Sequence, residues 1–262
     1  MKMKKYVLRL VTGAAAAALL LSGCAAGEKS ASEPSSASAG QTDAVTSATV
    51  KDSGTARAQI EAEAAALVHQ NENGQIVLSH KYGETVMPEH PQRIVCIKLE
   101  DLALALGVDL TACQQLEGYY LEDQIQSLGI GSIAVDEESN TVNLEQVLSY
   151  EPDLILLRDS FEPSVYEELS KIAPVAAFDL KDTEVSLLAM GKALGMEQEA
   201  LSRLEQYHQK LDDAKEALSA VSDNETAMLR VLKKEVRLYP ASTNDMSRFL
   251  YQDLGLTPDQ IG

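Results

Sequence analysis

The chain is poor in the residues that build metal centres and nucleic-acid surfaces. Its 262 residues include 4 His, and these are scattered without the spacing of zinc ligands. Lys and Arg total 22 against 40 Asp and Glu, which gives a formal net charge of −18. Binding to nucleic acid needs a basic face that neutralises phosphates. We therefore expect no histidine-built metal site, no resident cofactor and no nucleic-acid partner.

Motifs of hydrolytic enzymes are also missing. The sequence contains no nucleophile elbow, no triad order and no paired-carboxylate motif. After residue 23, no apolar run is long enough to cross a membrane. A composition of 45% hydrophobic and 24% charged residues is that of a globular protein. These absences give an enzymatic function no support.

The N-terminus reads as an export signal that ends in a cysteine. Four basic residues, Lys2, Lys4, Lys5 and Arg9, precede the apolar run 11–21, which is too short to span a bilayer with ease. The sequence LSGC, ending at Cys24, resembles the lipobox of bacterial lipoproteins, in which the thiol is acylated and the chain is cut before the cysteine. We expect a signal peptide over 1–23 and a lipid on Cys24, which would anchor the protein at the extracytoplasmic face of the cell membrane. The alternative is an ordinary signal peptide or anchor with an incidental cysteine.

Residues 24–74 are expected to form a flexible linker. Residues 25–57 are almost entirely small, polar or charged, without an aromatic residue or a Leu, and cannot bury enough apolar surface to fold. Ala and Glu at 58–69 favour a short helical stub. The folded part is expected to begin near residue 75.

From residue 75 the pattern alternates strands with helices. Apolar bursts without alternation predict buried parallel strands, while Asn143 and Gly107 are typical helix caps. Strands are expected at 93–97, 110–113, 132–135, 153–157 and 175–179, and helices at 100–106, 144–150 and 164–172. This predicts an α/β fold in which a Rossmann-like, doubly wound parallel sheet forms an N-terminal lobe over 75–182, with ligand contacts at the carboxyl ends of its strands.

The period of the pattern changes after residue 182. Region 183–222 predicts a helix ended by Gly195 and then a helix of about 25 residues, with apolar residues three and four apart. Such a helix suits a strut between two lobes. Strands at 228–232 and 236–239 and a helix at 246–254 follow. Because 223–262 cannot bury a core of its own, we expect an incomplete α/β C-terminal lobe.

Six segments resemble, in order, the substrate-binding proteins of iron-siderophore and cobalamin ABC importers, the FhuD and BtuF type. They are GETVMPEHPQRIVCI, LALALGVDL, VNLEQVLSYEPDLILL, YEELSKIAPVAAFD, EALSRLEQYHQKLDDAKEAL and RLYPASTNDMSRFLYQDLGL. The resemblance covers 75–262 and implies two lobes, a rigid interdomain helix and a ligand held between the lobes. Members of that family continue past the DLGL element, so it also implies that this chain ends before the second lobe is complete.

The resemblance implies a lipid-anchored binding protein that delivers a ferric siderophore to an ABC transporter permease, and not an enzyme. A cobalamin or haem receptor of the same fold is one alternative, and a non-transporting truncated product is another. No motif in the chain coordinates iron or a corrin.

Candidate ligand contacts follow the predicted strands. Arg158 comes directly after the fourth strand, where its guanidinium can pair with carboxylate or hydroxamate oxygens; the alternative is a surface ion pair with Asp159 or Glu162. Tyr119 and Tyr120 offer flat, amphipathic contact area or else pack within their loop.

Further candidates lie after the first strand and in the second lobe. Lys98 and Glu100 either contact the ligand, form a salt bridge or help to cap a helix. Tyr239 occupies the matching strand-end loop of the partial second lobe. By resemblance, Glu145 is a carboxylate that docks onto permease arginines, with Asp245 as a looser counterpart. The alternative for Glu145 is a solvated helix glutamate.

Two cysteines besides Cys24 lie inside or at the end of apolar runs. Buried free thiols are the default expectation for Cys96 and Cys113. A disulfide between adjacent strands is the alternative outside the cytoplasm.

Overall fold

The computed structural model describes residues 53–114, 118–222, 224–239, 247 and 249–259. The expected signal peptide, Cys24, most of the expected linker and Asp245 lie outside these ranges. Within them, no helix is both long and apolar enough to span a bilayer.

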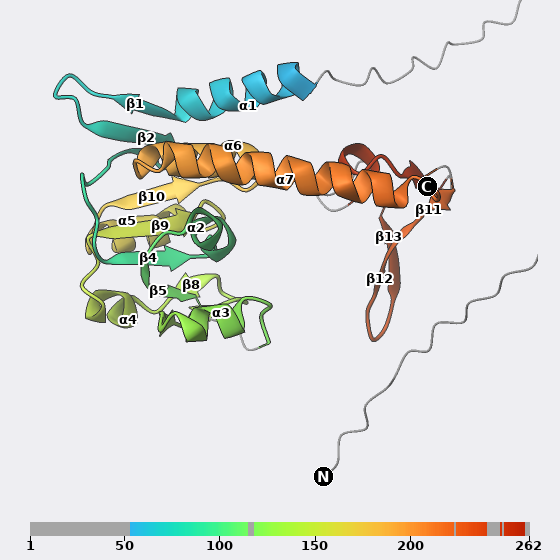
Figure 1. Cartoon of the computed structure of the whole chain (residues 1–262). Helices are drawn as coiled ribbons and strands as arrows, with labels where there is room; N and C mark the ends of the chain where they lie inside the picture. Colours follow the sequence, from blue (N-terminus) through green and yellow to red (C-terminus); the bar gives the residue numbers. More distant parts are fainter. Residues whose placement is uncertain (1–52, 115–117, 223, 240–246, 248, 260–262) are drawn as a thin grey trace, which may run out of the picture. The chain divides into compact units, whose positions relative to one another are not determined.

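A five-stranded parallel sheet forms the centre of the described chain (Figure 1). Its strands are β4 (Ile94–Ile97), β5 (Leu110–Gln114), β6 (Gly131–Ile133), β9 (Leu154–Arg158) and β10 (Val175–Phe178), in the order β10-β9-β4-β5-β6. Every neighbouring pair is parallel. The predicted doubly wound α/β fold is confirmed.

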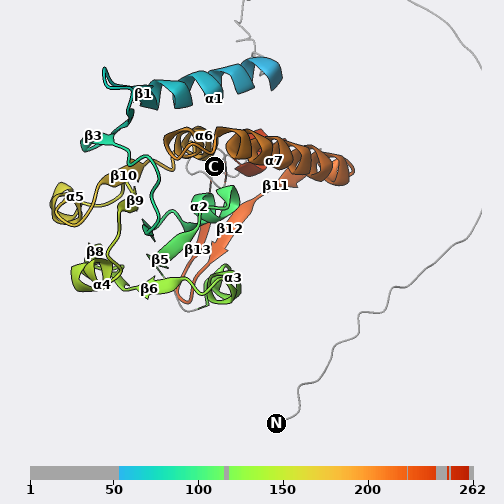
Figure 2. The ribbon, with the colours of Figure 1, turned by 60° about the vertical axis from the view of Figure 1, so that its left-hand side comes forward.

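Helices cover both faces of this sheet (Figure 2). One core packs under α2 (Glu100–Leu106), α3 (Glu122–Ser127), α6 (Thr183–Ala193) and α7 (Glu197–Leu218), and the other under α4 (Leu144–Ser149) and α5 (Pro163–Ser170). Along β4, Ile94 and Cys96 belong to the first core and Val95 and Ile97 to the second. Because both faces are covered, the strand is apolar throughout.

Local sequence signals explain several helix ends. The Asn143 side chain accepts a hydrogen bond from the N–H of Gln146 and caps α4, as predicted. Gly107 ends α2 with φ +82, a left-handed conformation that glycine adopts without a Cβ clash. The Asp182 side chain caps α6 by accepting from two backbone N–H groups.

The two sheet cysteines are free thiols in this structure. Cys96 and Cys113 lie opposite each other on β4 and β5, and both are buried. Burial raises the pKa of Cys113 to about 12 and that of Cys96 well above its usual value. The expectation of buried thiols is confirmed, and the disulfide alternative does not form.

The expected linker ends earlier than residue 74. Helix α1 (Ser53–Leu67) precedes a three-stranded antiparallel sheet of β1 (Val68–Gln70), β2 (Ile76–His80) and β3 (Gly83–Val86). Ala64 and Val68 are buried in the first core, and β1 pairs with β2. The boundary at residue 75 was wrong because a few small apolar residues suffice to dock α1 against α6, beside which it lies in Figures 1 and 2.

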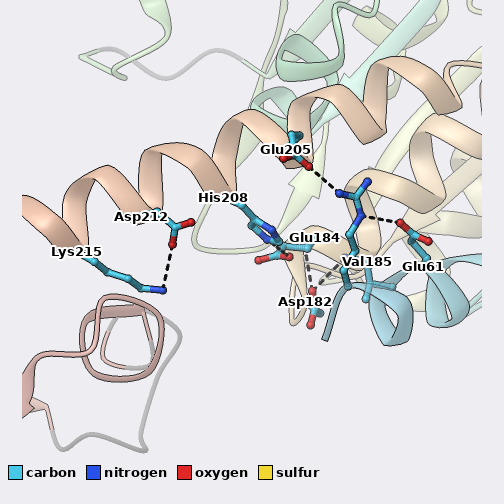
Figure 3. Close-up of polar contacts among 9 residues, drawn as sticks. Glu61, Asp182, Glu184, Val185, Glu205, His208, Asp212 and Lys215 are labelled. Carbon is cyan, nitrogen blue, oxygen red and sulfur yellow. Dashed lines mark hydrogen bonds and ion pairs between the residues drawn. The ribbon is translucent and has the colours of Figure 1, made fainter. Parts of the chain in front are cut away.

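Polar contacts also lie along and between α1, α6 and α7 (Figure 3). Arg57 on α1 contacts Glu61 at 2.9 Å and reaches Glu205 on α7 at 2.7 Å. His208 on α7 lies 2.8 Å from the carboxylate of Glu184 on α6. Because these side chains are exposed or half-buried, each contact contributes little beyond orientation.

The remaining elements differ modestly from expectation. The long helix α7 has 22 residues, which corresponds to about 33 Å. It is followed by β11 (Glu225–Thr226), the hairpin β12 (Met228–Val231) and β13 (Val236–Tyr239), and β14 (Thr257–Pro258). Of the helix expected at 246–254, the described part contains a π-helical turn, η1 (Phe249–Asp253), instead of an α-helix. The expected strand 132–135 is split into β6 and β7 (Val135–Asp136), and β7 forms a small hairpin with β8 (Thr141–Val142).

Candidate functional site

The strand order reverses at β4. Strands β5 and β6 lie on one side of it and β9 and β10 on the other, and the covering helices change faces at the same place. In open parallel sheets, ligands bind outside the carboxyl ends of the strands at such a switch point. The candidate site is therefore the edge where Lys98 and Arg158 stand at the ends of β4 and β9.

Lys98 is satisfied by partners within the chain. Its backbone has φ +61, which is uncommon for a residue other than glycine. Its Nζ lies 3.1 Å from Glu137 Oε2, 2.9 Å from Asn140 Oδ1 and 5.0 Å from the centre of the Phe161 ring. The side chain is only 16% exposed. Sequence reasoning did not identify Glu137 or Asn140 as part of this edge.

Glu100 ties the ends of two strands together. Its Oε1 accepts hydrogen bonds from the backbone N–H groups of Lys98 at 3.2 Å and Gln114 at 3.1 Å. The residue is 5% exposed. Burial raises the pKa of Glu100 to about 7, although backbone N–H bonds act in the opposite direction. The carboxylate thus binds the backbone of Lys98, while the Lys98 ammonium pairs with Glu137 instead.

Gln114 joins this cluster from the end of β5. Its Nε2 donates to Glu137 Oε1 at 2.5 Å. Its own Oε1 is buried and has no hydrogen-bond partner among the residues that the structure describes, in a residue that is 4% exposed. An unpaired buried amide oxygen is costly, and native structures contain few of them. We refer to Lys98, Glu100, Gln114, Glu137 and Asn140 as the strand-end polar cluster.

The β7–β8 turn, residues 137–140, reaches both sides of the switch point. Asp136 shapes the turn by accepting from the backbone N–H groups of Glu138 and Ser139, both at 2.9 Å. Asn140, with φ +50, accepts from Lys98 and donates through Nδ2 to the carbonyl of Ser160 at 3.0 Å. The turn therefore connects the loop after β4 with the loop after β9.

Arg158 is exposed at the end of β9. Its guanidinium forms no hydrogen bond or ion pair with any residue in the described ranges, so the alternative of a pair with Asp159 or Glu162 is absent there. Burial and the nearby Asp179 raise the pKa of Asp159, against the opposing effect of neighbouring cations. Arg158 is thus available to an incoming ligand.

Tyr119 and Tyr120 lie together after β5 and share one acceptor. Both hydroxyls donate to Asp101 Oδ1, that of Tyr119 at 3.0 Å. Their rings meet edge to face with centres 4.7 Å apart, and Tyr120 is 74% exposed. Burial and the neighbouring Asp101 raise the pKa of both phenols, which keeps them protonated hydrogen-bond donors.

The other candidates do not join the cluster. Tyr239 is partly buried at the end of β13 opposite Met228. Glu145 is exposed in the first turn of α4. Asp245 and Cys24 lie outside the described residues. In the described part of the chain, no group of three His, Cys, Asp or Glu side chains is placed to hold a metal ion.

The fold and its polar strand-end edge define an α/β ligand-binding lobe. A family model described as periplasmic binding protein matches residues 99–260, and the chain belongs to this family. The resemblance seen in the sequence is thereby confirmed at the level of the family.

Several known proteins are similar to the chain. YhfQ of Bacillus subtilis (strain 168), whose name describes an ABC transporter substrate-binding lipoprotein, is 32% identical over 57% of this chain and 49% of its own length. YfmC of the same organism, an Fe(3+)-citrate-binding protein, is 27% identical over 69% and 59%. Among solved structures, Staphylococcus aureus SirA complexed with staphyloferrin B is 26% identical, covers 70% of this chain and 64% of that chain, and has a TM-score of 0.57. The chain thus spans about half the length of the curated relatives it matches.

The raised pKa of Glu100 predicts a pH-dependent stability. Between about pH 4.5 and about pH 7 the folded protein retains a proton on Glu100 that the unfolded chain has lost, so stability falls as pH rises through this window. Glu100→Gln should remove this fall, which amounts to roughly 3 kcal/mol across the window. Urea unfolding at a series of pH values measures it.

Glu167→Gln makes the same chemical change at an exposed position on α5 and serves as the control. A Glu100→Gln protein whose stability changes with pH as steeply as that of the wild type would show that Glu100 is ionised throughout.

Proposed function

We propose that the protein is a lipid-anchored, extracytoplasmic substrate-binding protein that delivers a ferric siderophore to an ABC importer. The observation that carries this proposal is the similarity to SirA, a protein of the same fold whose structure includes the siderophore staphyloferrin B. YfmC, another relative of this chain, is named as a protein that binds Fe(3+)-citrate. The lipobox-like sequence at Cys24 and the lipoprotein name of YhfQ support the anchor.

The strand-end edge has the groups that such a ligand needs. A ferric siderophore is a bulky chelate whose outer surface carries oxygen atoms around a shielded metal. The guanidinium of Arg158, without a hydrogen-bond or ion-pair partner in the described part of the chain, can donate to those oxygens in a fixed fork geometry. The exposed ring of Tyr120 offers apolar contact with a polar tip. The ligand brings its own iron ligands, so the protein needs no metal-binding side chains and performs no covalent chemistry.

Ligand binding can be followed by intrinsic fluorescence. The chain has no Trp and 9 Tyr, so its emission comes from tyrosine alone. We expect residues 25–262 to show quenching that saturates near or below about 1 μM ferric hydroxamate, which corresponds to about −8 kcal/mol. Arg158→Gln should weaken binding roughly tenfold, because a charge-assisted hydrogen bond is lost.

Arg203→Gln, on exposed α7, is the matched control and should leave the affinity unchanged. Titrations with ferric catecholate, ferric citrate, cobalamin and haemin complete the panel. A response to cobalamin or haemin alone would refute the ferric-siderophore assignment, and no response to any member of the panel would refute the binding function.

Permease docking is assigned to Glu145. Because exposed charges at an interface act mainly on association and orientation, Glu145→Gln should lower iron uptake roughly 3- to 10-fold at limiting protein. The dissociation constant for the ligand should not change. Uptake of radioactive ferric siderophore by cells that carry the importer measures this, with Glu167→Gln as the control. Equal uptake by Glu145→Gln and wild type would remove Glu145 from the docking surface.

Lipidation is assigned to Cys24. Cys24→Ser should abolish labelling by radioactive palmitate and move the protein from the membrane to the soluble fraction, because the acceptor thiol is gone. Cys96→Ala changes a thiol buried in the sheet and should keep the label. Membrane retention of unlabelled Cys24→Ser would instead indicate an uncleaved anchor.

A further inference from the structure

The cation nearest the switch point is already neutralised by the chain itself. An ammonium group has three protons to donate, and that of Lys98 has Glu137 Oε2, Asn140 Oδ1 and the face of Phe161 around it. Little donor capacity remains for a ligand. A negatively charged chelate that approached Lys98 would have to compete with Glu137.

Glu137 itself faces outward. Its side chain is 51% exposed although both oxygens are engaged, Oε2 by Lys98 and Oε1 by Gln114. Burial alone would raise the pKa of Glu137, but the hydrogen bonds from Lys98 and Gln114 outweigh that effect and lower it. A carboxylate is therefore presented to any ligand at this edge in its ionised form.

Beside the pair of Lys98 and Glu137, the β7–β8 turn adds negative charge and no cation, whereas the cations Arg158 and Lys81 lie at the loop after β9. Residues 135–142, which form β7, β8 and their turn, contain Asp136, Glu137 and Glu138 but no Lys or Arg. Across the switch point, Asp159 follows Arg158. The buried Oε1 of Gln114, which has no partner among the described residues, is a further acceptor in the cluster and not a donor. The part of the edge around Lys98 is thus richer in acceptors and negative charge than in donors.

We infer that Glu137 makes this edge selective for the charge of the ligand, admitting neutral or cationic ferric chelates and disfavouring chelates that carry several negative charges. The inference rests on the proposed function and narrows its ligand. Three hydroxamate anions cancel the charge of Fe³⁺, whereas three catecholate dianions leave the complex strongly anionic. The edge therefore suits ferric trihydroxamates and opposes ferric tricatecholates.

The test compares two single-charge variants against two probes. Glu137→Gln removes the carboxylate but keeps an oxygen that can accept from Lys98, while Glu138→Gln removes the same charge from an exposed neighbour. Ferrichrome is the neutral probe and ferric enterobactin the anionic one. Unit charges a few ångströms apart near a protein surface change affinity by roughly tenfold or more.

We expect wild type to prefer ferrichrome, Glu137→Gln to bind ferric enterobactin roughly tenfold more tightly, and its affinity for ferrichrome to change less than about twofold. Glu138→Gln should leave both affinities nearly unchanged. Adding Lys98→Met to Glu137→Gln should cancel the gain, because the gain comes from the positive charge of Lys98 that Glu137 no longer balances.

Two results would overturn the inference. One is a wild-type preference for ferric enterobactin. The other is an equal effect of Glu137→Gln and Glu138→Gln, which would mean that only net charge matters. A wild type that binds neither probe nor any other ferric chelate would refute the proposed function itself, which is a separate outcome.

A measurement on the wild type alone guards against a variant that fails to fold. Since salt screens charge repulsion, the preference for ferrichrome should narrow as NaCl rises from about 0.01 M to 1 M. A preference that stays constant with salt would contradict a charge-based origin.

Discussion

The geometry of the strand-end edge depends on one buried carboxylate. Glu100 stands at the start of α2 and accepts the backbone N–H groups that leave β4 and β5, at Lys98 and Gln114. Buried amide groups without a partner are costly, so these two bonds fix where the strands end. They also hold Lys98 in a left-handed conformation from which its ammonium reaches Glu137 and Asn140. The raised pKa of Glu100 shows that burying its charged form is unfavourable. Near neutral pH, the ordered strand ends are therefore obtained at the expense of some folding stability.

The parallel sheet that ends at this edge is rigid because helices cover both of its faces. The core residues of β4 and β9 are almost completely buried between helices that change faces at the switch point. Because the strands are closely packed, the residues next to their ends have little freedom to move. Lys98 directly follows β4 and Arg158 is the last residue of β9, so the sheet places both. Asn140 links the two loops by contacting Lys98 and the carbonyl of Ser160. The sheet therefore fixes the positions of the residues at this edge, and the loops supply most of its polar side chains.

The parallel sheet and its helix caps could be predicted from the sequence, but only some residues of the candidate site could. Strands β4 and β10 are continuous apolar runs, and so is β9 up to Arg158, which is why these strands could be predicted. The helix caps at Gly107 and Asn143 could be predicted because they depend on local sequence alone. Helix α1 was assigned to a linker because Ala64 and Val68 are small and isolated among polar residues, and only tertiary packing shows that they are buried. Glu137 and Asn140 lie 39 and 42 residues from Lys98, and no local pattern connects such loops. Arg158 could be placed at a strand end, but that its guanidinium has no partner within the described ranges can be seen only in the folded structure.

Local charge, more than the charge of the whole chain, should decide which chelate is accepted. The chain carries a formal charge of −18, which opposes any anion at long range. At physiological ionic strength, however, exposed charges are screened beyond about 8 Å. A cation at the switch point could in principle overcome that weak field, and Lys98 stands in the right place to do so. Because Glu137 lies 3.1 Å from its ammonium, the ligand meets a neutral pair with a carboxylate on its exposed side. The guanidinium of Arg158, which has no hydrogen-bond or ion-pair partner among the described residues, then remains to orient the oxygens of a chelate, a task that requires hydrogen-bond geometry and not a net attraction between charges.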